Sequence, residues 1–481
     1  MVFSSLTFLL YLLTITISVY FLLGFSIKLQ NTWLLIASLF FYAWGEPVYV
    51  LILIASVIIN YILGLFIGKY KDKNKSVAKV FMVIDVVVNI SILFVFKYMG
   101  FFVGIINGII GFELLVVPQI VLPIGISFFT FQALSYAVEV YRGDANVQKN
   151  PFYMGLYVAF FPQLVAGPIV RYKTIAEYIN SRKFNIDTFS DGVCRFAVGL
   201  IKKVLVSNTI AVVVDKIYLL TETGADLYSV SVVMAWTGAI GYMLQIYYDF
   251  SAYSDMAIGL GKVFGFEFEE NFNYPYISKG IGEFWRRWHI SLGTWFKEYV
   301  YFPLGGSRVD NQDFMVRNTF IVWFLTGLWH GASWTFILWG LYNMIFILVE
   351  RLLGFEKWKN YFGLKYLYSN LIVLFGWVLF RAESLYVIRE FFANMFGVNG
   401  NKFVDATSIM ILKEYWMVYI PAIIFSAPIA KMLRTKLLNH DRLIVRGTCK
   451  VAYVLLLALG ITVTMLCLIR GGYNPFIYFN F

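Results

Sequence analysis

Apolar runs long enough to cross a lipid bilayer as helices recur along nearly the whole chain. About 20 predominantly apolar residues are needed to cross roughly 30 Å of hydrocarbon as a helix. The first three runs cover about 6–26, about 32–44 and, after a break at Gly45-Glu46-Pro47, the stretch up to about 68. Further runs lie at about 80–98, 101–117, 119–140, 193–219, 228–248, 251–264, 316–333, 335–350, 365–381, 412–430 and 451–469. This pattern predicts an all-α fold, a polytopic transmembrane helical bundle.

Two segments depart from the pattern. The stretch at about 152–170 is apolar but is interrupted by Pro162, Gly167 and Pro168, which predicts a kinked or re-entrant segment. Residues 265–313 mix aromatic, basic and acidic side chains. Tryptophan and tyrosine beside lysine and arginine are typical of a helix at the membrane interface.

The composition excludes an ordinary soluble protein. Of 481 residues, 60% are hydrophobic and 14% are charged, whereas soluble domains carry about 25% charged residues. The net charge of +11 comes from Lys and Arg gathered in short loops, as the positive-inside rule expects, so we expect no nucleic-acid partner. The cysteines Cys194, Cys449 and Cys467 form no CxxC pair, and no metal site is expected.

Two of the three histidines lie in unusual surroundings. His440 belongs to a basic polar loop and is interpreted as solvated surface. His330 lies in the apolar stretch TGLWHGASW, and His289 follows the pair Arg286-Arg287. Ionisable groups at membrane depth are functional candidates, and a neutral imidazole has one nitrogen ready to accept a proton. The alternative for His330 is a hydrogen bond between helices.

Charged residues near these histidines are further candidates. Arg286 and Arg287 suit a phosphate-bearing substrate, and their alternative is anchoring of lipid headgroups. Asp249, Ser251, Tyr253 and Asp255 form a polar cluster in an apolar run, either lining a tunnel or capping and packing helices.

Five segments make the chain recognisable. They are FFPQLVAGPIVR (160–171), YYDFSAYSDMAIG (247–259), FWRRWHISLGTWFKEYVYFPLGG (284–306), LTGLWHGASWTFILWG (325–340) and PFIYFNF (475–481). Together they resemble the membrane-bound O-acyltransferase superfamily, specifically its bacterial branch of alginate O-acetyltransferase-like proteins. The resemblance covers essentially the whole chain.

The resemblance implies a single membrane domain over 1–481, with about 11–14 membrane helices around a central funnel. Its parts would be N-terminal helices at 1–140, a catalytic core at 141–350 and C-terminal helices with an aromatic tail at 351–481. His330 matches the superfamily's catalytic histidine, and His289 matches the second motif position.

An outline of the chemistry follows from the resemblance. An acyl thioester such as acetyl coenzyme A enters from the cytoplasm, with no permanently bound cofactor. His330 takes the proton of an attacking hydroxyl, and His289 donates a hydrogen bond to the thioester carbonyl or its oxyanion. Arg286 and Arg287 would hold donor phosphates. The tunnel candidates are Asp249, Asp255 and Trp329.

The donor and the acceptor polysaccharide would lie on opposite sides of a bacterial cytoplasmic membrane, so either the acceptor enters a tunnel through the membrane or a relay is needed. Tyr478 is the candidate acyl carrier, with an interfacial aromatic anchor as the alternative. A secreted or membrane-anchored acetyltransferase of the SGNH hydrolase type would be the partner. Other readings are D-alanyl or other acyl transfer to teichoic acid-type polymers, a transporter without acyl-transfer chemistry, and a scaffold for a secreted acetyltransferase.

Overall fold

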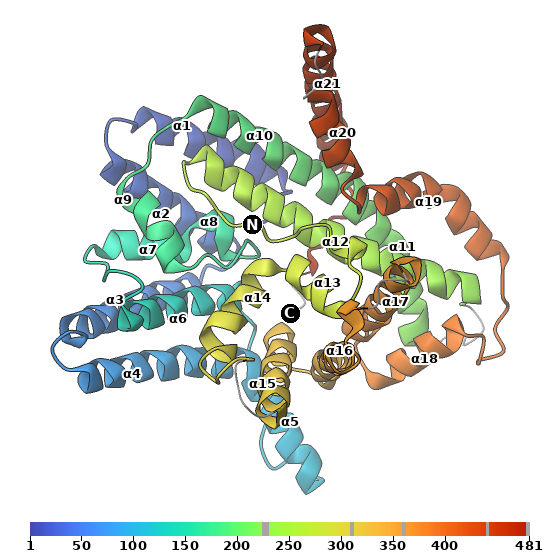
Figure 1. Ribbon diagram of the computed structural model, residues 1–481, viewed down its shortest axis with the longest axis horizontal. Coiled ribbons are helices and arrows are strands. Elements are labelled where there is room, and N and C mark those ends of the chain that lie inside the picture. Colours follow the sequence, from blue (N-terminus) through green and yellow to red (C-terminus); the bar gives the residue numbers. More distant parts are fainter. Residues whose placement is uncertain (224–229, 308–311, 358–361, 439–441, 478–481) are drawn as a thin grey trace. The chain divides into compact units, whose positions relative to one another are not determined.

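Every regular element of the described chain is a helix (Figure 1). The computed structural model describes residues 1–223, 230–307, 312–357, 362–438 and 442–477. Within them the prediction of an all-α helical fold is confirmed. The chain divides into two compact units: unit 1 comprises Met1–Phe196 and Ser254–Glu270, and unit 2 comprises Ala197–Tyr253 and Asn271–Phe481.

Unit 1 is built mainly from the N-terminal helices. They are α1 (Thr14–Leu22), α2 (Ile27–Gly45), α3 (Val50–Tyr70), α4 (Lys75–Leu93), α5 (Met99–Ile110), α6 (Ile126–Arg142), α7 (Pro151–Ala159), α8 (Phe161–Leu164), α9 (Tyr172–Asn180) and most of α10 (Ile186–Ile201). Inside the α3–α4 pair, Asn60 and Asn89 donate amide hydrogen bonds to each other at 3.3 and 2.9 Å. Such pairing satisfies polar groups that lipid cannot.

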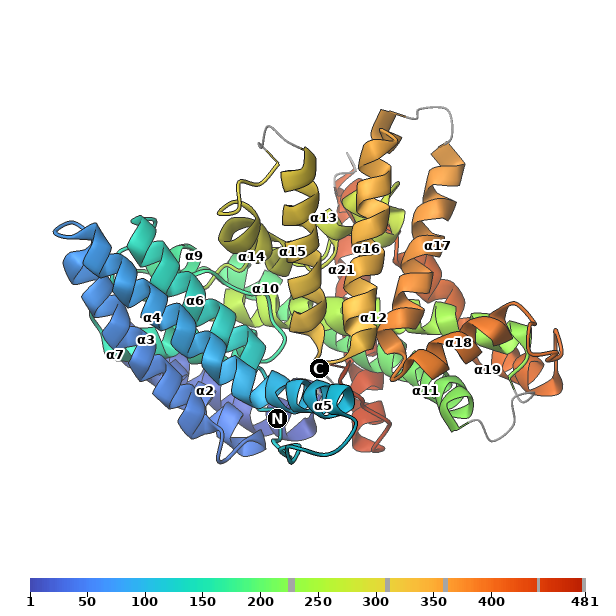
Figure 2. The same cartoon turned by 90° about the horizontal axis from the view of Figure 1, so that it is seen from below.

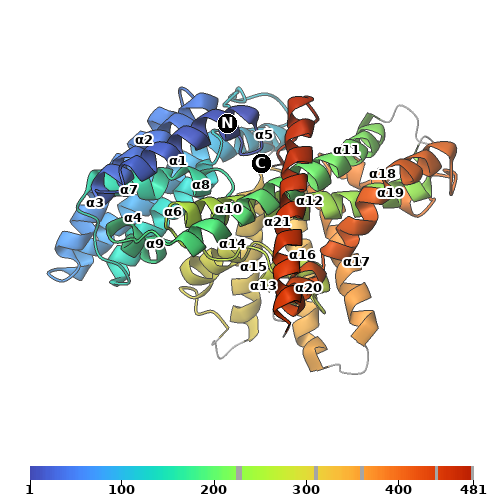
Figure 3. The same ribbon diagram turned by 90° about the horizontal axis from the view of Figure 1, so that it is seen from above.

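Unit 2 carries the remaining helices. They are α11 (Asn208–Thr223), α12 (Val232–Val263) as far as Tyr253, α13 (Ile281–Arg287), α14 (Ile290–Phe296), the π-helical turn η5 (Lys297–Tyr301), α15 (Gln312–His330), α16 (Trp334–Leu352), α17 (Phe362–Arg381), α18 (Leu385–Met395), α19 (Ala406–Phe425), α20 (Ile429–Leu438) and α21 (Leu443–Ile469). Helices α15, α16 and α17 lie side by side (Figure 2). Helix α20 packs against α21 (Figure 3).

Seven segments of the described chain are long and apolar enough to span a membrane. They are Val50–Tyr70, Lys75–Ile110, Ile186–Thr223, Trp334–Leu352, Gly363–Arg381, Ala406–Phe425 and Ile444–Ile469. The last of these exposes large apolar side chains, among them Val454, Leu455 and Leu459, as a lipid-facing helix does. The protein is therefore a multi-pass membrane protein.

The path of the chain through its irregular segments is as follows. The interruption at 152–170 is confirmed, because α7 ends at Phe160 in a non-helical conformation and α8 restarts there. The apolar runs at 228–248 and 251–264 belong to one continuous helix, α12. The interfacial segment folds as several short helices.

Close contact between α15 and α16 depends on two glycines. A Cβ atom added at Gly327 would lie 2.6 Å from the Phe336 carbonyl oxygen, and one at Gly340 would lie 2.4 Å from the Trp323 carbonyl oxygen. Both distances are below van der Waals contact, so only glycine permits this approach. Ser333 caps the start of α16 by accepting a hydrogen bond from the Phe336 N–H. This sharp turn places His330 at the end of α15.

Candidate active site

His289 joins two short helices in an uncommon backbone conformation. It lies between α13 and α14 with φ 44° and ψ 54°, in the left-handed region. Such a conformation in a residue other than glycine costs about 1–3 kcal/mol, and it persists only where surrounding contacts hold it. Here the Ile290 N–H donates to the Asn271 carbonyl at 2.9 Å, and the Gly293 N–H donates to the His289 carbonyl at 3.1 Å.

The start of α13 is held by a carboxylate from another helix. Glu350 of α16 accepts hydrogen bonds from the Ile281 N–H at 2.5 Å and from the Gly282 N–H at 3.0 Å. These N–H groups have no partner within α13, and a carboxylate at a helix start also suits the helix dipole. The contact orients the helix that carries Arg286.

His289 and His330 line the same cavity in unit 2, which has a volume of about 470 Å³. Arg286 from α13, Lys297 and Tyr301 from η5, and Thr326 from α15 also contribute to its wall. Among the described residues that line this cavity, two are cationic and none is a carboxylate. Its electrostatics therefore favour an anionic substrate group.

His330 is the last residue of α15 and is 5% exposed. Three aromatic rings meet its imidazole edge to face, with centroids 4.9 Å away for Trp329, 5.0 Å for Trp339 and 5.1 Å for Phe380. These rings fix the orientation of the imidazole at the cavity wall, a requirement for a group that moves a proton.

His289 is 3% exposed, and its Nδ1 lies 3.2 Å from the side-chain oxygen of Asn271. Burial lowers the pKa of His289 to about 3, against a smaller opposing effect of a backbone hydrogen bond. The imidazole is therefore neutral at physiological pH. The Trp329 ring also contacts His289, at 5.9 Å between centroids, and so touches both histidines.

The structure separates the two arginines that the sequence had grouped. Arg286 lines the cavity. Arg287 forms a salt bridge of 2.9 Å with Glu283 and donates a hydrogen bond of 3.1 Å to the Asn273 carbonyl. The pKa of Glu283 is lowered overall: burial opposes the shift, and the Lys279 N–H and Arg287 outweigh it.

The aspartates expected in the tunnel have other partners. Asp249 forms a salt bridge with Lys203, and Asp255 forms one of 2.9 Å with Arg195. Neither occurs among the described residues that line the cavity. Tyr478 and His440 lie outside the described residues.

Asp249 and Lys203 both hold the C-terminal tail, residues 470–477. Asp249 Oδ2 accepts a hydrogen bond from the Ile477 N–H at 3.3 Å, and Lys203 donates to the Pro475 carbonyl. The ring of Phe476 packs on Tyr253 with 5.1 Å between centroids. The chain up to Ile477 therefore has a fixed path over α12 and over η3 (Lys202–Ser207), the π-helical segment between α10 and α11.

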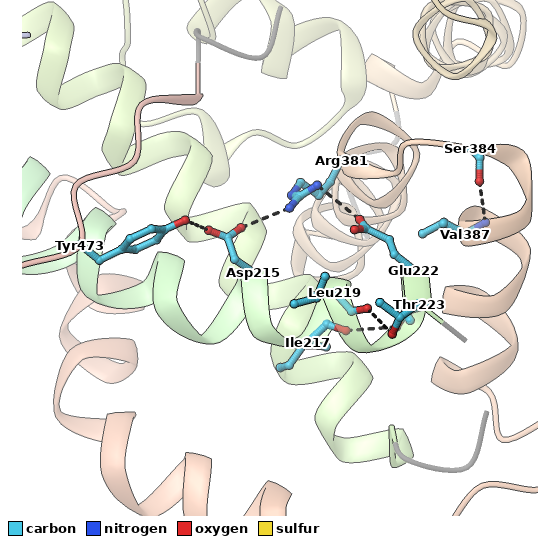
Figure 4. A network of polar contacts seen from close by, with 10 residues as sticks. Asp215, Ile217, Leu219, Glu222, Thr223, Arg381, Ser384, Val387 and Tyr473 are labelled. Atoms are coloured by element: carbon cyan, nitrogen blue, oxygen red, sulfur yellow. Dashed lines mark hydrogen bonds and ion pairs between the residues drawn. The ribbon is translucent and has the colours of Figure 1, made fainter. Parts of the chain in front are cut away.

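The tail is tied to the unit at a second point. The Tyr473 hydroxyl donates a hydrogen bond of 2.8 Å to Asp215 of α11 (Figure 4). Asp215 also forms a salt bridge of 3.2 Å with Arg381 at the end of α17, and Arg381 reaches Glu222 at 3.6 Å. Burial, and then the contact with Asp215, raise the pKa of Tyr473 to about 12, so its hydroxyl stays protonated and donates.

Two site residues escaped sequence reasoning. Asn271 contacts His289 although 18 positions separate them. Lys297 could have been predicted from its spacing. It lies seven residues after Ile290, and Ile290, Gly293, Thr294 and Lys297 share one helix face, which lines the cavity. A basic residue on that face after His289 was the signal.

A cationic cavity lined by two histidines, in a chain with seven candidate membrane-spanning segments among its described residues, is typical of a membrane enzyme. The chain belongs to the membrane-bound O-acyltransferase family, whose model matches residues 4–357. It is 42% identical over 401 residues to "Probable alginate O-acetylase AlgI" of Pseudomonas aeruginosa, covering 82% of this chain and 75% of that protein.

The names of two further relatives mention polymers other than alginate. The "Peptidoglycan O-acetyltransferase" of Helicobacter pylori is 34% identical over 402 residues, which cover 76% of this chain and 74% of the relative. The "Teichoic acid D-alanyltransferase" of Bacillus subtilis is 28% identical over 257 residues, covering 51% and 62%. The chain is thus an acyltransferase of the membrane.

Proposed function

We propose that this chain is an O-acetyltransferase of a bacterial cytoplasmic membrane. It takes an acetyl group from a cytoplasmic thioester, acetyl coenzyme A, toward hydroxyl groups of an extracytoplasmic polysaccharide. The observation that carries the proposal is the cavity that contains His330 and His289 together with Arg286 and Lys297. The names of the Pseudomonas and Helicobacter relatives support acetyl as the group transferred.

The proposed reaction is a general-base acyl transfer. His330 accepts the proton of the attacking hydroxyl while its oxygen bonds to the carbonyl carbon of the thioester. The carbon–sulfur bond then breaks, and the leaving thiolate takes the proton from the His330 imidazolium. Arg286 and Lys297 bind the phosphates of the donor. Phosphate binding is favoured here because no carboxylate occurs among the described residues that line the cavity.

The acceptor of this first transfer is proposed to be Tyr478. Its phenol would lose a proton to His330, form the acetyl ester and pass the acetyl group on outside the membrane. The anchored tail supports this idea, because contacts from Lys203, Asp249 and Asp215 fix the chain leading to that residue. A secreted or membrane-anchored acetyltransferase of the SGNH hydrolase type would complete the transfer to the polymer. A Tyr478→Phe variant that retains full polymer acetylation in cells would exclude the relay.

The test uses purified protein in lipid nanodiscs and acetyl coenzyme A labelled in the acetyl group. His330→Ala should lower thioester turnover by a factor of about 10²–10⁴, the usual contribution of a general base. His440→Ala, which removes the histidine of the basic loop, is the matched control and should retain turnover. Undiminished turnover in His330→Ala would refute the assignment of the base.

A second candidate is transfer of a D-alanyl group to a teichoic acid-type polymer, and the relative from Bacillus subtilis favours it. A D-alanyl thioester in the same assay separates the two, because the preferred donor will show the higher kcat/KM. A transporter or a scaffold without chemistry of its own would turn over neither donor.

A further inference from the structure

The carboxylate of Asp215 holds two parts of unit 2 at once, one through each oxygen (Figure 4). Its Oδ2 accepts the hydrogen bond of 2.8 Å from the Tyr473 hydroxyl in the tail. Its Oδ1 accepts a hydrogen bond of 3.2 Å from the Arg381 guanidinium at the end of α17. Asp215 therefore joins the tail directly to the end of α17.

Arg381 has further partners on the same face of α11. Glu222 lies 3.6 Å from its guanidinium, and the Tyr218 ring lies under the guanidinium with its centroid 5.0 Å from Cζ. Asp215, Tyr218 and Glu222 follow the spacing of one helix face. A planar guanidinium that pairs with two carboxylates and stacks on a ring has little freedom to move. Because Arg381 is the last residue of α17, these contacts fix that end of the helix beside α11.

Phe380, the residue before Arg381, packs against the proposed base. Its ring is 2% exposed and meets the His330 imidazole edge to face, with 5.1 Å between centroids. It also lies 5.0 Å from the rings of Phe336 and Trp339 in α16. Phe380 thus contacts both sides of the turn between α15 and α16. In a close-packed interior a displacement of Arg381 would move Phe380 and, with it, the imidazole.

We propose that Asp215 and Arg381 are positioning residues of the acetyl transfer, which together set the position of the tail relative to His330. The inference rests on the proposed function, in which His330 takes the proton of a phenol that the tail carries. Such a reaction needs its groups held within about 3–3.5 Å of each other. An ion pair that reaches both the tail and the packing around the base restricts the movement of one relative to the other.

The proposal assigns neither residue a part in the chemistry itself. Neither Asp215 nor Arg381 occurs among the described residues that line the cavity. Loss of either should therefore slow the transfer while the KM for acetyl coenzyme A stays at its wild-type value.

The test follows single-turnover acetylation of the chain by acetyl coenzyme A labelled in the acetyl group, with purified protein in lipid nanodiscs. The measured rate is the appearance of label on the C-terminal peptide, detected by mass spectrometry after proteolysis. Dividing this rate by the number of sites that bind the donor removes the effect of any misfolded fraction. Tyr473→Phe should lower the rate about fivefold, because a hydrogen bond is lost. Arg381→Met should lower it about tenfold, because a charge-assisted contact is lost.

A double-mutant cycle shows whether Asp215 joins the two effects. In the Asp215→Ala background the connection is already broken, so adding Tyr473→Phe should lower the rate further by no more than about twofold. Arg381→Lys keeps the positive charge and should recover most of the rate lost in Arg381→Met. Arg389→Met, which removes an exposed arginine of α18, is the control and should keep the wild-type rate.

The contrary outcomes are equally specific. A fivefold loss from Tyr473→Phe that persists in the Asp215→Ala background would overturn the proposal, and so would a wild-type rate in Arg381→Met. If wild type turns over the thioester but carries no label on its C-terminal peptide, the tail is not the acceptor, and the proposal fails while acyl transfer stands. If wild type turns over no thioester at all, the proposed function itself fails.

Discussion

Lys203 forms a salt bridge with Asp249 where both side chains are almost completely excluded from solvent, with exposed fractions of 3% and 1%. Both residues also hold the tail, through the Pro475 carbonyl and the Ile477 N–H. A buried pair of charges stabilises a fold little in itself, but removing one partner leaves an uncompensated charge. The position of the tail therefore depends on both members of this ion pair.

The first prediction concerns the stability of this pair. Asp249→Asn should lower the free energy of unfolding by about 3–5 kcal/mol, because Lys203 remains buried without a countercharge. Thermal unfolding in detergent measures the effect. The double variant Lys203→Met with Asp249→Leu should recover most of the loss.

Arg389→Met is the control for this prediction. The Arg389 side chain is 82% exposed and lies 3.9 Å from Glu390, and ion pairs made by exposed side chains contribute about 0–1 kcal/mol. Equal destabilisation by Asp249→Asn and Arg389→Met would contradict the role assigned to burial.

The second prediction concerns the contact between α15 and α16. Gly327→Ala places a Cβ atom 2.6 Å from the Phe336 carbonyl oxygen, which the helices can accommodate only by moving apart. We expect a loss of about 1–3 kcal/mol in unfolding free energy and lower turnover, because His330 moves with the end of α15. Gly447→Ala in α21 is the control: its Cβ meets nothing within 4 Å, and alanine should be slightly stabilising there. Similar Tm values for the two variants would refute the close-contact argument.

Sequence patterns predicted the membrane helices and singled out His289 and His330 as site candidates. Span length, hydropathy and a histidine in an apolar stretch are local properties of the sequence. These patterns could not predict that His289 and Asn271 meet. That contact depends on a left-handed turn at a residue other than glycine, a conformation that only a few per cent of such residues adopt. The partners of Asp249 and Asp255 were equally hidden, because a carboxylate in an apolar run has the same sequence signature whether it lines a tunnel or pairs with a cation.

The third prediction concerns the pH dependence of stability. Folded His289 has a pKa of about 3, against 6.5 for an unperturbed histidine, so unfolding takes up a proton below pH 6.5. This contribution to stability is fully present above pH 6.5 and is lost as the pH falls toward 3, at about 1.4 kcal/mol per pH unit. Between pH 8 and 5, wild type should lose about 2 kcal/mol more than His289→Gln, which has no titrating group there. Identical pH slopes in thermal or denaturant unfolding would contradict a neutral, buried His289.

The fourth prediction concerns the cations of the cavity. Arg286→Met and Lys297→Met should each raise the KM for acetyl coenzyme A about tenfold, because a charge-assisted hydrogen bond to a phosphate is lost. The kcat should change little, since the phosphates are bound equally in the ground state and the transition state. With S-acetyl-N-acetylcysteamine, which has no phosphate, neither variant should differ from wild type. Lys413→Met, which removes an exposed cation of α19, is the control. A fall in kcat with an unchanged KM would instead mean that Arg286 and Lys297 act on the charge that develops at the reacting carbonyl.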